Sequence, residues 1–83
     1  MVLLVLTKQG FHEAKTILEN SDITCWVNQH ILTKDEIAEY RSKGIHITDF
    51  AYDIDIHSKD QINNALELLN EYHPDEVVFV EQQ

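Results

Sequence analysis

The chain has 83 residues, of which 43% are hydrophobic, enough apolar material for one small core and a single domain over residues 1–83. Fifteen acidic and six basic residues give a formal net charge of −9. This charge argues against direct nucleic-acid binding and against a membrane surface, and fits a soluble protein or one with a basic partner. No run approaches the roughly 20 apolar residues of a membrane span, so we expect a cytoplasmic protein.

Residues 2–6 are five consecutive apolar side chains with no polar face. This pattern predicts a strand buried on both sides at the centre of a sheet. From Phe11 to Leu18 the apolar side chains recur three and four positions apart, which predicts a helix ending at the polar cluster 20–22. The β-branched and aromatic residues 23–27 predict a second strand.

The second helix has the clearest local signal. Thr33 and Glu36 have the spacing of a capping box, and Leu32 and Ile37 are placed for a hydrophobic staple. Lys43–Gly44 should end this helix, because a cation suits its last turn and glycine can adopt a left-handed conformation.

Residues 45–50 alternate between apolar and polar side chains, which predicts a third strand. The alternation continues over residues 51–57 with a change of phase. This segment either prolongs the strand beyond a bulge or is an extended connection over the sheet, and we favour the connection.

Ser58 and Gln61 have the spacing of a second capping box. The apolar residues of the third helix are expected to form one buried stripe, made by Ile62, Ala65, Leu66, Leu69 and Tyr72. Pro74 follows and should stop the helix. Residues 77–80 are a second run without a polar face and predict the fourth strand.

Strands that alternate with helices predict an α/β fold, here a three-layer α/β/α domain with a four-stranded parallel sheet in β-α-β-α-β-α-β order. We favour the strand order 2-1-3-4, with 3-2-1-4 as the alternative. Three helices cover two faces of such a sheet poorly. Apolar surface made by Ile45, Ile47, Val77 and Phe79, or by their alternating neighbours, would then be free for a homodimer contact. Alternatively, the apolar residues of 51–57 fold over that face and leave a monomer.

Ligands of open parallel sheets bind at the carboxyl ends of the strands. The candidate ligand-binding residues at these ends are Thr7, Lys8, Gln9, Gly10, Asn28 and His30. The first four could hold an anion at a helix N-terminus. No phosphate-binding glycine motif is present, so we favour the simpler interpretation that Thr7 caps the helix and Gly10 eases the turn.

Asp53, Asp55 and His57 alternate, so an extended backbone would point all three side chains in one direction. Two carboxylates and an imidazole suit a divalent metal, and His30 or Asp49 could join them. A solvated polar face explains the same alternation, and we favour it. We predict no cofactor.

Cys25 is the only cysteine, so no internal disulfide can form. It lies within a predicted strand, where a buried, inert thiol is a better account than a nucleophile. The catalytic serine motif G-x-S-x-G is also missing from the sequence.

Two classes of function therefore remain open. The first is a non-enzymatic binding module that acts as a homodimer or docks on a basic protein surface. The second is an enzyme that uses a small ligand or a metal at the carboxyl ends of the strands. The lack of a catalytic motif and the strong negative charge favour the first class.

Overall fold

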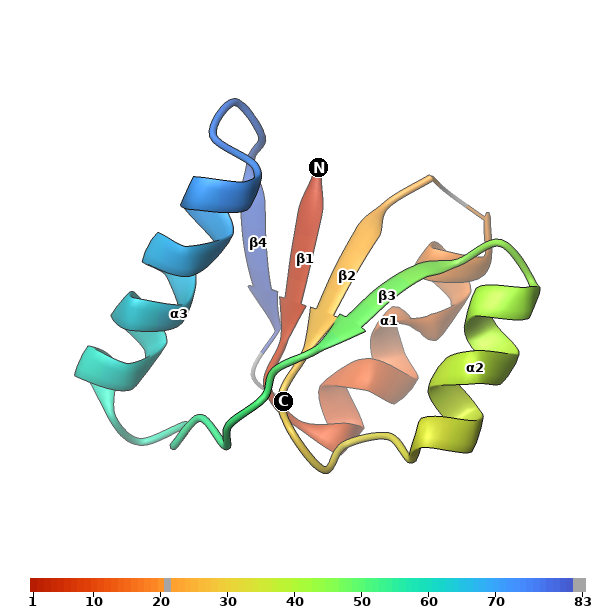
Figure 1. Cartoon of the computed structure of the whole chain (residues 1–83), viewed down its shortest axis with the longest axis horizontal. Helices are drawn as coiled ribbons and strands as arrows, with labels where there is room; N and C mark the ends of the chain where they lie inside the picture. The colour runs from red at the N-terminus through yellow and green to blue at the C-terminus, as the bar shows by residue number, and fades with distance from the viewer. Residues whose placement is uncertain (21, 82–83) are drawn as a thin grey trace.

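The computed structural model of the chain describes residues 1–20 and 22–81, so the expected turn at Ser21 and the residues after Glu81 lie outside it. Helices and strands alternate as predicted (Figure 1). Their bounds are β1 (Val2–Val5), α1 (Lys8–Asn20), β2 (Thr24–Val27), α2 (Lys34–Ser42), β3 (His46–Asp49), α3 (Lys59–Tyr72) and β4 (Val78–Glu81).

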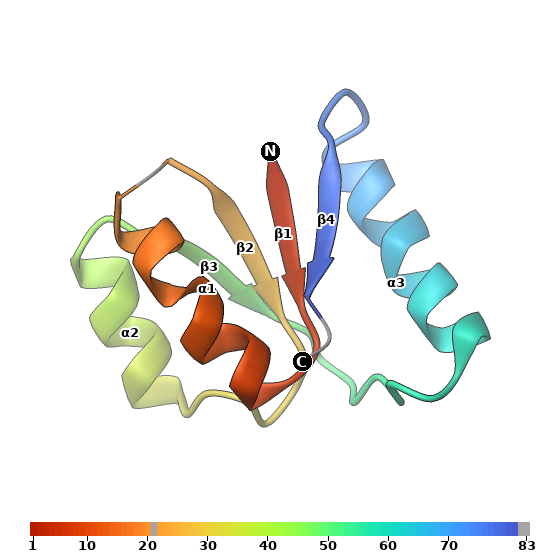
Figure 2. The same ribbon diagram turned by 180° about the vertical axis from the view of Figure 1, so that it is seen from behind.

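All four strands are parallel, in the order β3-β2-β1-β4. The favoured order 2-1-3-4 is therefore wrong, and the alternative 3-2-1-4 is confirmed. Both orders place β1 inside the sheet, and the periodicity of a strand does not specify its neighbours, so the sequence pattern could not separate them. In the observed order α1 and α2 lie on one face and α3 lies on the other (Figures 1 and 2).

The central position of β1 is confirmed. Leu4 pairs with Trp26 of β2 on one side and with Val80 of β4 on the other. The side chains of Val2, Leu4 and Val5 have no accessible surface. Two-sided burial is what an uninterrupted apolar run predicts for an inner parallel strand.

Each face of the sheet has its own hydrophobic core. Under α1 and α2 the buried residues are Val5, Phe11, Leu18, Ile23, Cys25, Val27, Ile31, Ile37, Ile45 and Ile47. Under α3 they are Val2, Leu4, Leu6, Phe50, Ile54, Ala65 and Leu69. Successive residues of β1 alternate between the two cores, as the pleat of a strand requires.

The capping box of α2 forms as predicted. The hydroxyl of Thr33 accepts a hydrogen bond from the Glu36 backbone N–H (3.1 Å), and the Glu36 carboxylate accepts one from the Thr33 backbone N–H (2.9 Å). This second bond lowers the pKa of Glu36. After the helix, Gly44 has a φ of 86°, the left-handed conformation expected there.

The start of α3 differs from the prediction. Ser58 accepts a hydrogen bond from the Gln61 backbone N–H (3.3 Å), but the Gln61 side chain accepts from the Asp55 backbone N–H (2.8 Å) instead of completing the box. Tyr72 is also not in the buried stripe, since 64% of it is exposed. Its ring lies against Trp26 on the surface of the sheet, with centroids 5.5 Å apart.

The segment after β3 is a connection, as favoured, and not a longer strand, because β3 ends at Asp49. Ile54 is buried under α3, whereas Tyr52 and Ile56 remain exposed. Of its three alternating apolar side chains, the connection therefore contributes one to the core.

Strand β4 lies at an edge of the sheet and is the most exposed of the strands. Exposed fractions are 63% for the preceding Val77, 53% for Phe79 and 39% for Val80. In Figure 2, α1 and α2 lie on the side of the sheet that holds β2 and β3, and neither helix crosses β4. None of the helices in residues 1–20 and 22–81 has the length and apolarity to cross a membrane.

Candidate functional site

The observed topology defines where a ligand crevice would lie. The winding direction of the sheet reverses between β1 and β4, so the expected crevice is at the carboxyl ends of these two strands. Thr7–Gly10 follow β1 there, and Glu81 ends β4. The polar residues after β2 and β3 lie at the same end of the sheet, because the carboxyl ends of parallel strands lie together.

The protein's own residues occupy much of this crevice. The Leu6 backbone N–H donates to the Glu81 carbonyl (3.0 Å). A Cβ atom on Gly10 would lie 2.8 Å from Glu81 Cγ and 3.1 Å from the Thr7 hydroxyl. Gly10 is therefore needed because β4 passes close to the first turn of α1, and not because its backbone is left-handed.

Thr7 caps α1, as favoured from the sequence. Its hydroxyl accepts a hydrogen bond from the Gly10 backbone N–H (3.0 Å), and its carbonyl accepts from the Phe11 N–H (3.1 Å). Lys8 and Gln9 point to the surface. These contacts give Thr7 a structural role at the helix start, whereas binding of an anion here remains a prediction.

Asn28 is the most constrained of the candidate residues. It is only 5% exposed. Its Nδ2 donates to the carbonyls of Leu6 (3.2 Å) and Ile54 (2.9 Å), and its Oδ1 accepts from the backbone N–H groups of Gln29 (2.9 Å) and Ile54 (2.8 Å). An amide side chain offers two donors and two acceptor positions, so its capacity is filled. Asn28 fastens the ends of β1 and β2 to the connection after β3.

His30 is exposed on the turn after β2. Its φ of 70° lies in the left-handed region, which costs a non-glycine residue about 1 kcal/mol.

We expect His30→Gly to raise the free energy of unfolding by about 0.5–1 kcal/mol, because glycine adopts this backbone without strain. Urea denaturation followed by circular dichroism measures the change. A matched His46→Gly variant, in the regular strand β3, should lose stability instead. A loss of stability in His30→Gly would show that the imidazole makes contacts worth more than the strain.

The predicted metal ligands do not lie on one extended segment. A turn at residues 56–57 interrupts the alternation, and the Asp55 carboxylate accepts a hydrogen bond from the His57 backbone N–H (2.9 Å). In the part of the chain that the structure describes, no group of three His, Cys, Asp or Glu side chains is placed to hold a metal ion. The structure thus does not bring Asp53, Asp55 and His57 together.

Cys25 faces the core beneath α1 and α2 and has no accessible surface. Burial raises the pKa of its thiol to about 12. A thiol reacts as its thiolate, so at neutral pH this group is inert, as the sequence indicated.

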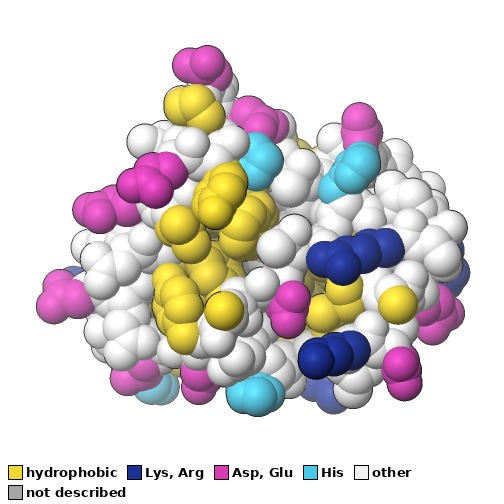
Figure 3. All heavy atoms as spheres, in the orientation of Figure 1, with side chains coloured by type: hydrophobic (Ala, Val, Ile, Leu, Met, Phe, Trp, Pro, Cys, Tyr) yellow, Lys and Arg dark blue, Asp and Glu magenta, His cyan; other side chains and the backbone are white. Residues whose placement is uncertain are grey.

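A hollow of about 460 Å³ lies along β2 and β3, between the end of α2 and His73 after α3, and was not anticipated from the sequence. A row of aromatic rings, Tyr72, Trp26, Phe50 and Tyr52, runs beside it with centroid distances of 5.5, 5.3 and 5.6 Å. Figure 3 shows hydrophobic side chains gathered along this flank of α3.

Two of the polar side chains around this hollow have partners within the chain. Arg41 donates through Nε to the Ile47 carbonyl (3.0 Å), and His46 lies 3.4 Å from the Asp22 carboxylate. They are therefore partly used in holding the β3 edge rather than free for a ligand.

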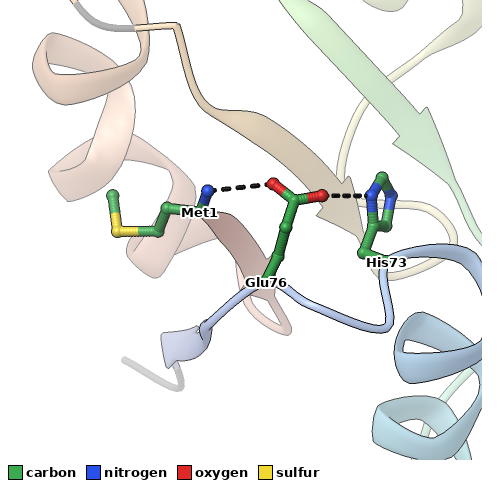
Figure 4. A network of polar contacts seen from close by, with 3 residues as sticks. All are labelled: Met1, His73 and Glu76. Atoms are coloured by element: carbon green, nitrogen blue, oxygen red, sulfur yellow. Dashed lines mark hydrogen bonds and ion pairs between the residues drawn. The ribbon is translucent and has the colours of Figure 1, made fainter.

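A small network joins the start of β1 to the turn that precedes the adjacent strand β4 (Figure 4). The Glu76 carboxylate lies 2.9 Å from the Met1 ammonium group and 2.6 Å from His73 Nδ1. The Met1 ammonium group, and after it His73, lower the pKa of Glu76. This network fixes the turn between α3 and β4, and it leaves the apolar residues of β4 uncovered.

The second hollow, of about 330 Å³, lies between α1 and β4. Its lining is mostly apolar and consists of Met1, Leu3, Ile17, Ile23, Phe79, Val80 and Glu81. We call the exposed residues Met1, Ile17, Val77, Phe79 and Val80 the β4 patch.

Comparisons of the chain with protein-family models, with curated proteins and with solved structures find no match.

Proposed function

We propose that this protein is a non-catalytic interaction module that works as a homodimer in the cytoplasm, with the β4 patch as its docking surface. The observation that carries the proposal is the contrast between the sequence and the exposure of β4. Residues 77–80 have the apolar pattern of a strand buried on both sides, yet Phe79 is 53% exposed. Such a pattern is suited to burial by a second molecule.

The charge distribution agrees with this proposal. Thirteen of the fifteen acidic residues lie outside residues 76–81, where Glu76 and Glu81 are the exceptions. Glu76 is paired with Met1 and His73, and Glu81 packs against Gly10. The acidic surface keeps the protein soluble and offers a complementary face to a basic protein partner, while the β4 patch is left for apolar contact.

Sedimentation equilibrium tests the proposal. At micromolar concentrations we expect a mass that rises with concentration towards twice the monomer's 9.7 kDa. Phe79→Lys should remain monomeric, because the charge would be buried at the contact. Tyr52→Lys is the matched control, since Tyr52 is similarly exposed but lies outside the patch. A monomer mass for the unmutated protein at all concentrations would contradict the dimer.

Thermal melting separates this proposal from an enzyme with its site at the carboxyl ends of the strands. A ligand that binds only the folded state raises the melting temperature. We expect no shift with nucleotides, inorganic phosphate, zinc or magnesium. A saturable shift with one of them would support the enzyme.

A further inference from the structure

We infer that two copies of the chain pair their β4 strands antiparallel about a two-fold axis at Phe79, so that the two four-stranded sheets form one continuous sheet. This inference rests on the proposed dimer and adds its geometry. It names the partner surface as the backbone edge of a second β4, and not only as an apolar face.

The backbone of β4 provides the first argument. The N–H groups of Val2 in β1 and of Leu6 just after it donate to the carbonyls of Val77 (2.9 Å) and Glu81 (3.0 Å). Backbone groups of successive residues point to opposite sides of a strand, so Phe79 also faces β1. The N–H and C=O groups of Val78 and Val80 therefore point to the open edge, where the sheet order ends.

The opposite edge strand, β3, is less suited to pairing with a second chain. On β3, the Arg41 side chain crosses the edge and donates from Nε to the Ile47 carbonyl (3.0 Å). His46 on this strand is exposed and polar. A charged side chain that covers the edge of a sheet opposes pairing with another chain. The free edge suited to pairing is therefore β4.

The positions of the outward groups select the register. An axis at Phe79 places Val78 opposite the partner's Val80 and Val80 opposite the partner's Val78, so that each pair exchanges two backbone hydrogen bonds. An axis at Val78 would instead require Glu76 to pair with the partner's Val80. The Glu76 N–H already donates to the His73 carbonyl (3.2 Å). In the register centred on Val78, this N–H would therefore not be available to the partner strand.

The side chains are compatible with the same register. The two Phe79 rings lie opposite each other on the α1 face, beside the hollow that contains Ile17, and aromatic cross-strand pairs are favourable. Glu81 comes opposite the partner's Val77 and so does not face another carboxylate. Its side chain lies back against Gly10, away from the shared edge.

A cysteine cross-link tests this register. In an antiparallel pair without direct hydrogen bonds the facing Cα atoms are about 4.5 Å apart, which is within disulfide range. We expect Phe79→Cys to form a covalent dimer in air, visible as a band of doubled mass on a non-reducing gel and lost with reductant. The unmutated protein should not cross-link, because Cys25 is buried.

Val78→Cys is the matched control. An axis at Phe79 places Val78 two positions away from its own copy, so this variant alone should cross-link at least tenfold more slowly than Phe79→Cys. If the unmutated protein sediments as a dimer and the two variants cross-link equally, strand pairing in this register is overturned while the proposed dimer stands. If the unmutated protein is monomeric, both fail.

A second pair of variants separates backbone pairing from apolar contact. Val80→Pro removes an outward N–H that β1 does not use, and proline is tolerated on edge strands. Val80→Thr keeps that N–H and the branched shape. We expect Val80→Pro to weaken the dimer at least tenfold more than Val80→Thr, with circular dichroism confirming that both monomers are folded. Equal dimer affinities would contradict the inference.

Discussion

Leu4→Asp is expected to abolish folding. Leu4 has no accessible surface, lies in the middle of β1 and packs in the core beneath α3. A carboxylate at this position would be buried without a partner, which costs several kcal/mol. A domain of this size has a total stability of only about 5–10 kcal/mol, so the substitution removes most or all of it.

Circular dichroism and thermal melting measure this effect. The matched control is Val80→Asp, because Val80 pairs directly with Leu4 across the sheet but is 39% exposed at the edge. This variant should retain a cooperative melt as a monomer. A cooperative transition of Leu4→Asp close to that of the unmutated protein would show that β1 is not buried on both sides.

Local signals were sufficient to predict every element of this fold. The capping box at Thr33 and Glu36 and the left-handed Gly44 depend on residues close in the chain, and the structure has them as expected. Likewise, the five apolar residues of β1 require two covered faces wherever the other strands lie.

Strand order could not be predicted in the same way. It depends on whether β3 pairs with the outer side of β2 or with the free side of β1. Both arrangements allow right-handed crossovers. The apolar spacing of Ile45 and Ile47 places them on one face of β3 in either case. The pattern of β4 was equally ambiguous, because an apolar run indicates burial but not whether the covering surface belongs to the same molecule.

The places of the candidate residues in the fold were predicted, but their contacts were not. Asn28 follows β2 at the carboxyl edge, as expected, but its partner Ile54 is 26 positions away in the sequence. Gln61 similarly turns to Asp55 instead of to the helix cap. These contacts depend on how the connection after β3 lies across the sheet, and no local spacing encodes that.

Asn28→Ala is the second variant with a large expected effect. It removes four hydrogen bonds and leaves backbone groups of Leu6, Gln29 and Ile54 without partners in a buried site. At about 1 kcal/mol for each bond, we expect a loss of about 4 kcal/mol in the free energy of unfolding. For a domain of this size the melting temperature should fall by about 15–30 °C.

Asn28→Asp is the matched control, because it keeps the shape of the side chain and both acceptor interactions but loses the two N–H donors. Its carboxylate would face the carbonyls of Leu6 and Ile54, so burial and repulsion should raise the pKa of the introduced carboxyl above its unfolded value. The resulting penalty is then present at neutral pH and declines as the pH falls through that raised pKa, where the protonated carboxyl can donate one bond.

Denaturation at pH 7 and pH 5 measures this difference against the unmutated protein. Asn28→Asp should recover part of its lost stability at pH 5, whereas Asn28→Ala should not. If Asn28 served mainly to hold a ligand, either substitution would leave the melting temperature of the free protein nearly unchanged. A large fall in both variants would instead assign Asn28 to the joint between β1, β2 and the connection after β3.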